Sequence, residues 1–212
     1  GNLIVNSTGT GRLRAVTTGV LTINGNLQIN AGIFEVGSNN GSVIVKGTTT
    51  VASGSTLDFN RGSLKNQGNM ILNGNALSSE TSTVNSYLEF SGSGVPQTLT
   101  GTGTFTGRIS NLGVSNPLGL TLSTPLVTEN VYLIAGTITN SSNITFGSGS
   151  TLSRFVQIGS ATNITSGGNF DSSPNFNMGT GTYTIYYLKE TTPRVIGFEI
   201  PSTKSINSLY LD

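Results

Sequence analysis

GNLQINAGIFEVGSNNGSVIVK (residues 25–46) and GTTTVASGSTLDFNRGSLKNQ (residues 47–67) are consecutive units of one repeat. Each unit begins with Gly and contains three short runs in which apolar and polar residues alternate, as in Leu27/Ile29 and Leu57/Phe59. Because successive side chains of an extended chain point to opposite faces, this alternation predicts strands. The Gly, Asn and Ser residues between the runs are typical of turns. Each unit is therefore predicted to form three short strands.

The same unit extends in both directions along the chain. Its starts are Gly1, Gly25, Gly47 and Gly68, which are 24, 22 and 21 residues apart. A repeat of this length with three strands fits one coil of a β-solenoid, whereas an up-and-down barrel or a sandwich does not require strands in triplets of fixed spacing. The predicted fold class is all-β: a β-solenoid with coils of 21–24 residues, and a right-handed parallel β-helix is the favoured form.

The repeat is most regular in the first part of the chain. We expect regular coils over residues 1–90 and less regular coils over 91–158, where short alternating runs continue with a looser period. Residues 159–182 are polar and contain Gly167-Gly168 and Pro174, which predicts a loop or a widened coil. Residues 183–212 return to alternating runs and are expected to close the same solenoid.

Composition narrows the possible functions. Only 9% of the 212 residues are charged, the net charge is +1, and Cys, His and Trp are absent. The scattered charges predict no nucleic-acid partner. No apolar run approaches the length of a membrane helix, so no membrane insertion is expected. Without His or Cys, the commonest general base and the thiolate metal ligands are missing, and we expect no cofactor, no metal and no catalytic residue.

One charged column is the candidate for an active site. Aligning the coils places Arg14, Glu35 and Asp58 at the same strand position, between apolar neighbours, so that they would point outward one above another. The functional interpretation is an acid pair for glycosidic cleavage. The structural interpretation, which we favour, is a solvated ladder in which Arg14 offsets two stacked carboxylates.

Two weaker patterns concern binding. Tyr183, Tyr186 and Tyr187 could form an aromatic platform for sugars, although Tyr183 and Tyr187 share one face with Ile185 and a core position is favoured for them. TGTGTFTG (residues 100–107) places Thr at every second position, as an ice-binding face would, but the Thr column does not repeat on each coil. Ordinary strand propensity explains this segment better.

Longer phrases of the chain resemble a known group of proteins. These phrases are GSVIVKGTTT (41–50), the segment from GSGVPQTLTGTGTFTG to GSGSTL (92–152), and YTIYYLKE with GFEIPSTKSINSLYLD (183–190 and 197–212). They are similar to the repeat segments of very large surface proteins of Bacteroidota. The resemblance implies export through the type IX secretion system, a location on the cell surface, and a role as an adhesin or filament, in some members in gliding motility.

The expected function follows from the repeat and the resemblance together. We expect a non-catalytic structural or adhesive repeat that acts as a rigid rod, with neighbouring repeats and surface glycans as partners. The chain begins at Gly without an export signal, so a mature product or a piece of a longer protein is expected. The alternative is a β-helix that binds or cleaves carbohydrate, and an ice-binding solenoid is the third interpretation.

Overall fold

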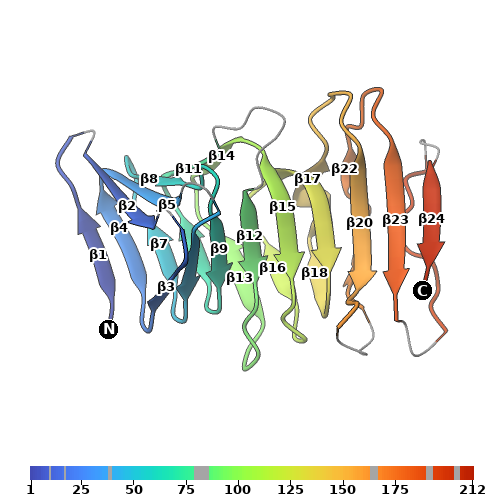
Figure 1. The fold of residues 1–212 in the computed structure, drawn as a ribbon, viewed down its shortest axis with the longest axis horizontal. Helices are drawn as coiled ribbons and strands as arrows, with labels where there is room; N and C mark the ends of the chain where they lie inside the picture. The colour runs from blue at the N-terminus through green and yellow to red at the C-terminus, as the bar shows by residue number, and fades with distance from the viewer. Residues whose placement is uncertain are drawn as a thin grey trace.

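The chain folds into a β-solenoid in which three parallel sheets run along one axis. The structure is a computed structural model that describes residues 1–9, 11–16, 18–37, 40–78, 86–162, 167–189, 193–202 and 206–212. Every strand pairing in this part of the chain is parallel, and the two termini lie at opposite ends of the long axis (Figure 1). The predicted fold class is confirmed.

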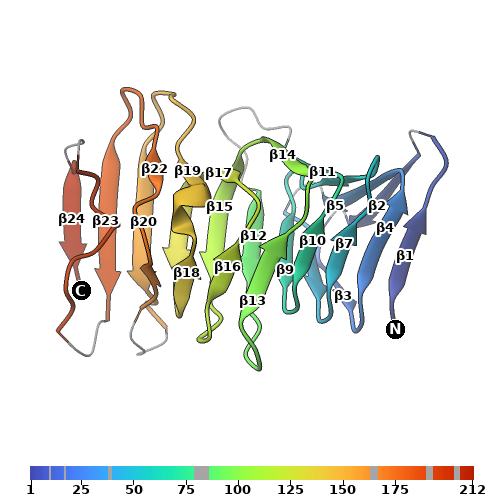
Figure 2. The same cartoon turned by 180° about the vertical axis from the view of Figure 1, so that it is seen from behind.

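In the described residues sheet A has eight strands, which correspond to about eight coils. It is seen best from behind (Figure 2). In spatial order its strands are β1 (Leu3–Asn6), β4 (Leu27–Ala31), β7 (Thr49–Val51), β10 (Met70–Leu72), β13 (Gln97–Thr100), β16 (Leu120–Leu122), β18 (Thr137–Thr139) and β21 (Asn169–Phe170).

Sheets B and C form the other two walls. Sheet B consists of β2 (Arg12–Val16), β5 (Ile33–Gly37), β8 (Thr56–Asp58), β11 (Asn75–Ser78) and β14 (Thr104–Gly107). Sheet C consists of β3 (Val20–Ile23), β6 (Ser42–Val45), β9 (Ser63–Asn66), β12 (Tyr87–Phe90), β15 (Ile109–Val114), β17 (Leu126–Leu133), β20 (Arg154–Gly159), β23 (Tyr183–Leu188) and β24 (Ser208–Leu211), with β19 (Ile144–Phe146) and β22 (Asn175–Phe176) attached to β17.

The register of the first coils follows the predicted repeat. Leu3 pairs with Leu27, Leu27 with Thr49, and Thr49 with Met70, which are 24, 22 and 21 residues apart. The Gly residues that open the units stack on one another, since Gly25 N donates to Gly1 O at 3.0 Å and Gly47 N donates to Gly25 O at 2.9 Å. The sequence period therefore corresponds to one complete coil.

The inside of the solenoid is one continuous apolar core. Most inward-pointing side chains of the three sheets are buried, and those of Val45, Leu57, Phe59 and Leu72 are completely buried. In β5 Phe34 and Val36 point inward, while Ile33 is only partly buried. Each buried residue of this kind contributes about 1.5–3 kcal/mol, and no single coil could bury its own inward face.

The wall formed by sheet B changes after the fifth coil. β17 is eight residues long, and its first residues pair with β19, which in turn pairs with β22, while its last residues continue sheet C. A short 3-10 helix (Ser141–Asn143) precedes β19. Within the segment 159–182, β21 pairs with β18 and β22 with β19, so these residues also add strands to the stack.

Candidate functional site

The charged column predicted from the sequence lies in register on sheet B. Arg14 of β2 is the partner of Glu35 on β5, and Glu35 is the partner of Asp58 on β8. Their neighbours Phe34 and Leu57 are fully buried in the core, so the column occupies the outer side of the sheet. The predicted alignment of these three residues is thereby confirmed.

A second arginine, which the sequence analysis did not single out, completes this cluster. Arg12 Nη1 donates to Glu35 Oε2 and to Asp58 Oδ2, both at 2.7 Å. Arg14 Nε donates to Glu35 Oε1 at 2.7 Å, and Asn60 Nδ2 donates to the same oxygen at 2.9 Å. Arg12 was missed because its side chain reaches across two coils, which column alignment alone does not reveal.

The cluster differs from the expected solvated ladder. The side chains of Arg12 and Arg14 are 43% and 48% exposed, whereas those of Glu35 and Asp58 are 0% and 3% exposed. The two arginines therefore cover the carboxylates and shield them from water. The physical reason is that each arginine reaches over a carboxylate of a neighbouring coil while its own outer edge stays in solvent.

This arrangement favours the ionised form of Glu35. Burial alone would raise the pKa of Glu35, but hydrogen bonds from Arg12, Asn60 and Arg14 outweigh it and lower the pKa below its usual value. The hydrogen bond to Glu35 raises the pKa of Arg12 against the opposing effect of burial. A general acid for glycosidic cleavage needs a protonated carboxyl with a raised pKa. The cluster is instead suited to joining three successive coils.

The tyrosines divide between the core and the surface. Tyr183 and Tyr187 are buried on either side of Ile185, as the favoured interpretation predicted. The Tyr183 hydroxyl donates to Glu199 O at 2.6 Å, and the Tyr187 hydroxyl donates to Glu199 Oε1 at 2.5 Å. Tyr186 lies on the opposite, outer face of sheet C. Of the three predicted contacts, only Tyr186 is thus placed to meet a ligand.

Tyr186 belongs to a row of aromatic side chains on the outer face of sheet C, called here the aromatic strip. It is part of β23, and its ring lies between Phe155 of β20, at a centroid distance of 5.7 Å, and Tyr210 of β24, at 4.9 Å. Tyr132 of β17 continues the row at 5.1 Å from Phe155, and Tyr87 of β12 ends it at 5.8 Å from Tyr132. Burial raises the pKa of Tyr87 and of Tyr132.

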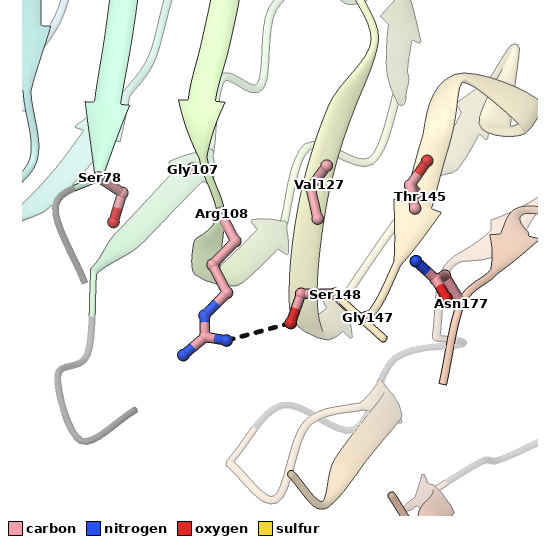
Figure 3. Close-up of a pocket in the computed structure, with 8 residues that line it drawn as sticks. All are labelled: Ser78, Gly107, Arg108, Val127, Thr145, Gly147, Ser148 and Asn177. Carbon is pink, nitrogen blue, oxygen red and sulfur yellow. Dashed lines mark hydrogen bonds between the residues drawn. The ribbon is translucent and has the colours of Figure 1, made fainter. Parts of the chain in front are cut away.

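A pocket of about 420 Å³ lies where sheet B ends and β17 takes its place. Figure 3 shows the side chains of Arg108 and Ser148 pointing toward one another, with Thr145 and Asn177 beyond Ser148. Arg108 Nη1 donates to Ser148 Oγ at 3.1 Å and lies 3.1 Å from Glu129 Oε1.

A second cluster of charges contacts two residues that line this pocket, since Glu129 pairs with Arg108 and accepts a hydrogen bond from Ser148 Oγ at 2.7 Å. Glu129 Oε2 accepts a hydrogen bond from Nε of Arg154, which is almost completely buried. Arg154 Nη1 also donates to the backbone oxygens of Leu152 and Met178. Glu129 thus holds two arginines, and the hydrogen bonds of this cluster run mainly between neighbouring coils. Removing one partner of such a buried ion pair would leave an uncompensated charge.

The described part of the chain contains no group of three or more His, Cys, Asp or Glu side chains that could hold a metal ion. Within the same residues, no helix is long and apolar enough to cross a membrane.

The chain was also compared with known proteins. No protein-family model, no curated protein and no solved structure matches it.

Proposed function

We propose that the chain is a non-catalytic structural and adhesive repeat of an extracellular bacterial surface protein. In this role it is a rigid rod that spaces or presents a binding region, and its partners are neighbouring repeats of the same protein and surface glycans. The observation that carries the proposal is the unbroken stack: eight strands of sheet A add one coil after another around one apolar core. A continuous core resists bending, because each coil is held by the coils on both sides.

The charged side chains support the same role. Arg12 links carboxylates of two further coils, and Glu129 links Arg108 with Arg154. Lys65 of β9 also pairs with Glu89 of β12 in the next coil, at 3.2 Å. Charges that tie neighbouring coils together are expected in a spacer, whereas a glycosidase needs an accessible pair of carboxyl groups with different protonation states.

Cleavage of carbohydrate is the alternative that the charged column raises. We expect purified residues 1–212 to release no new reducing ends from neutral or acidic polysaccharides, and a variant with Glu35→Gln and Asp58→Asn to behave in the same way. The assay measures reducing ends over a panel of both classes. Release by the wild-type chain that the double variant loses would overturn the proposal and make the charged column an active site.

Ice binding, the third interpretation, requires an unbroken array of threonines. On the outer face of sheet A, Thr48 and Thr50 of one coil are followed by Asn69 and Ile71 in the next. This interruption favours the structural proposal over an ice-binding face.

The extracellular location and export through the type IX system are part of the proposal and rest on the sequence resemblance. An antibody raised against residues 1–212 is expected to label intact source cells, because a surface rod is accessible from outside. Labelling that appears only after the cells are permeabilised would contradict the surface location.

A further inference from the structure

The outer face of sheet C changes character along the axis of the solenoid. In the first three coils its outward side chains are mainly small or polar, as in Thr22, Ser42 and Ser63. From β12 onward the face carries the five rings of the aromatic strip, and the strands β15, β17, β20, β23 and β24 lie side by side in Figure 1. The strip therefore occupies the C-terminal part of one flat wall.

The rings follow one another without a gap because they occupy two neighbouring outward columns of sheet C. In one column Tyr132 is in register with Gln157, Gln157 with Tyr186, and Tyr186 with Tyr210. Phe155 lies two residues before Gln157 on the same strand and fills the space between Tyr132 and Tyr186. The contacts are edge-to-face from Tyr87 to Tyr186 and stacked between Tyr186 and Tyr210.

Gly113 allows the strip to pass through the fifth coil. This residue faces outward on β15, opposite Glu89 on β12 and Tyr132 on β17. A Cβ atom at position 113 would lie 2.9 Å from Cζ of Tyr87 and would overlap its hydroxyl oxygen. The Tyr87 ring thus lies over a residue without a side chain and reaches toward Tyr132. Any larger residue at this position would interrupt the row.

From Tyr132 onward the polar groups beside the rings are uncharged. Asn130, Gln157, Thr184 and Ser208 are the outward neighbours of the rings on β17, β20, β23 and β24, and all four are partly exposed. The nearest ion pair on this face, between Lys65 and Glu89, lies at the N-terminal end of the strip. Partly exposed rings flanked by amides and hydroxyls match a ligand that has both C–H surfaces and hydroxyl groups.

We propose that the aromatic strip binds an uncharged polysaccharide, with the sugar chain lying along the axis of the solenoid. Pyranose rings present apolar C–H faces to aromatic rings and hydroxyls to amides, and successive coils are about 4.8 Å apart, a spacing close to that of pyranose units in an extended chain. The inference rests on the proposed adhesive role and names the class of glycan that it would take.

Tyrosine fluorescence reports directly on this face. The chain has no Trp and six Tyr residues, and Tyr87, Tyr132, Tyr186 and Tyr210 all belong to the strip. The folded wild-type chain is titrated with hydroxyethyl cellulose, xylan and mixed-linkage β-glucan, with polygalacturonate as the acidic comparison. Affinity gel electrophoresis measures retardation by the same polymers. We expect at least one neutral polymer to bind and to change the tyrosine emission, and polygalacturonate not to bind.

Matched variants separate ring stacking from folding. Tyr186→Leu and Tyr210→Leu are each expected to weaken binding roughly tenfold, which corresponds to about 1.4 kcal/mol, whereas Tyr186→Phe keeps the ring and should bind as the wild type does. Tyr210 lies at the end of the stack and is 52% exposed, so its replacement should leave the fold intact. Ile44→Ala, on the same face of the ring-free coils, is the control and should not change binding.

The remaining outcomes also decide the inference. It is overturned if no neutral polymer binds the folded chain, if only polygalacturonate binds, or if the Leu variants bind as tightly as the wild type. Self-association of the wild-type chain in sedimentation, lost in the Leu variants, would likewise overturn it and assign the strip to a second copy of the chain. Binding followed by release of reducing ends would instead contradict the non-catalytic function and leave the strip as the binding face.

Discussion

Arg12 is the residue on which the charged cluster of sheet B depends, because it holds carboxylates 23 and 46 residues further along the chain. Arg12→Gln removes two charge-assisted hydrogen bonds, so that Asp58 loses its contact with Arg12 while Glu35 keeps the hydrogen bonds from Arg14 and Asn60. We expect the free energy of unfolding to fall by about 1.5–3 kcal/mol, measured by urea unfolding at pH 7. Arg61→Gln removes the same charge from an exposed position and should cost less than about 0.5 kcal/mol.

The loss caused by Arg12→Gln should depend on pH. In the wild type the pKa of Glu35 is lowered in the folded state, so its stabilising effect is present above the pKa of the unfolded chain and is lost as pH falls through the folded value. The difference between wild type and variant should therefore be largest near neutral pH and shrink in acid. An equal difference at all pH values would contradict the ion-pair interpretation.

Asp171 provides a second test at the scale of one residue. Burial alone would raise its pKa, but hydrogen bonds from the backbone N–H groups of Ser141 and Asn140 and from the hydroxyls of Ser141 and Ser172 lower it from 3.8 to about 2. Because the folded pKa is lowered, the stabilisation is present above about pH 4 and disappears as pH falls toward 2.

Asp171→Asn should accordingly lower the free energy of unfolding by about 1 kcal/mol at pH 7, the net value of a typical hydrogen bond, and by less at the lowest pH measured. Urea unfolding of both proteins at pH 7, 4 and 2.5 measures this. A difference that grows as the pH falls would show that the sign of the shift is wrong.

At the scale of single residues, the sequence predicted which charged residues align but not how deeply their side chains are buried. The coil spacing was sufficient to bring Arg14, Glu35 and Asp58 together, because strand pairing follows the repeat. Burial of the carboxylates depends on where the long Arg12 side chain lies, and the repeat contains no information on that. The aromatic strip was missed apart from Tyr186 because its rings are spread over two columns and so form no repeat in the sequence.

The turns that open the third and fourth coils leave little room for a side chain. A Cβ atom at Gly47 would lie 2.8 Å from Gly25 O, and at Gly68 it would overlap Gly47 O. Gly68→Ala must therefore push two coils apart, and we expect it to destabilise the protein by about 1–3 kcal/mol. Gly94→Ala is the matched control, since nothing lies within 4 Å of its added methyl group.

Thermal unfolding of Gly68→Ala and Gly94→Ala distinguishes a clash between stacked coils from the general effect of replacing glycine by alanine. The midpoint should fall clearly for Gly68→Ala and stay near that of the wild type for Gly94→Ala. Equal midpoints for all three proteins would mean that the coils do not approach one another as closely as the structure shows.

Elements were predicted best where the repeat is regular. The three-strand units of residues 25–67 correspond to β4 to β9, because alternation and turn residues there leave little choice of register. Past residue 91 the sequence shows runs but not which wall they join. β17 illustrates the reason: one continuous strand pairs with β19 through its first residues and with β20 through its last, and no local pattern marks that division.

The whole molecule depends on one property, the in-register stacking of successive coils, which both the rod and the aromatic strip require. The absence of Cys makes this property accessible to a clean cross-linking test. Thr50 of β7 and Ile71 of β10 are Cα partners on the outer face of sheet A, at the spacing of neighbouring strands that a disulfide can span. Thr50 and Thr121, by contrast, lie on strands that are three places apart in the same sheet. The distance between these two strands is about 14 Å, which a disulfide cannot span.

The most direct measurement is therefore oxidation of two double-cysteine variants, Thr50→Cys with Ile71→Cys and Thr50→Cys with Thr121→Cys, followed by counting free thiols in the monomer. The stacked solenoid predicts an intramolecular disulfide in the first variant and two free thiols in the second. A first variant that keeps both thiols, or a second that forms the disulfide as readily, would contradict the register and with it the rod.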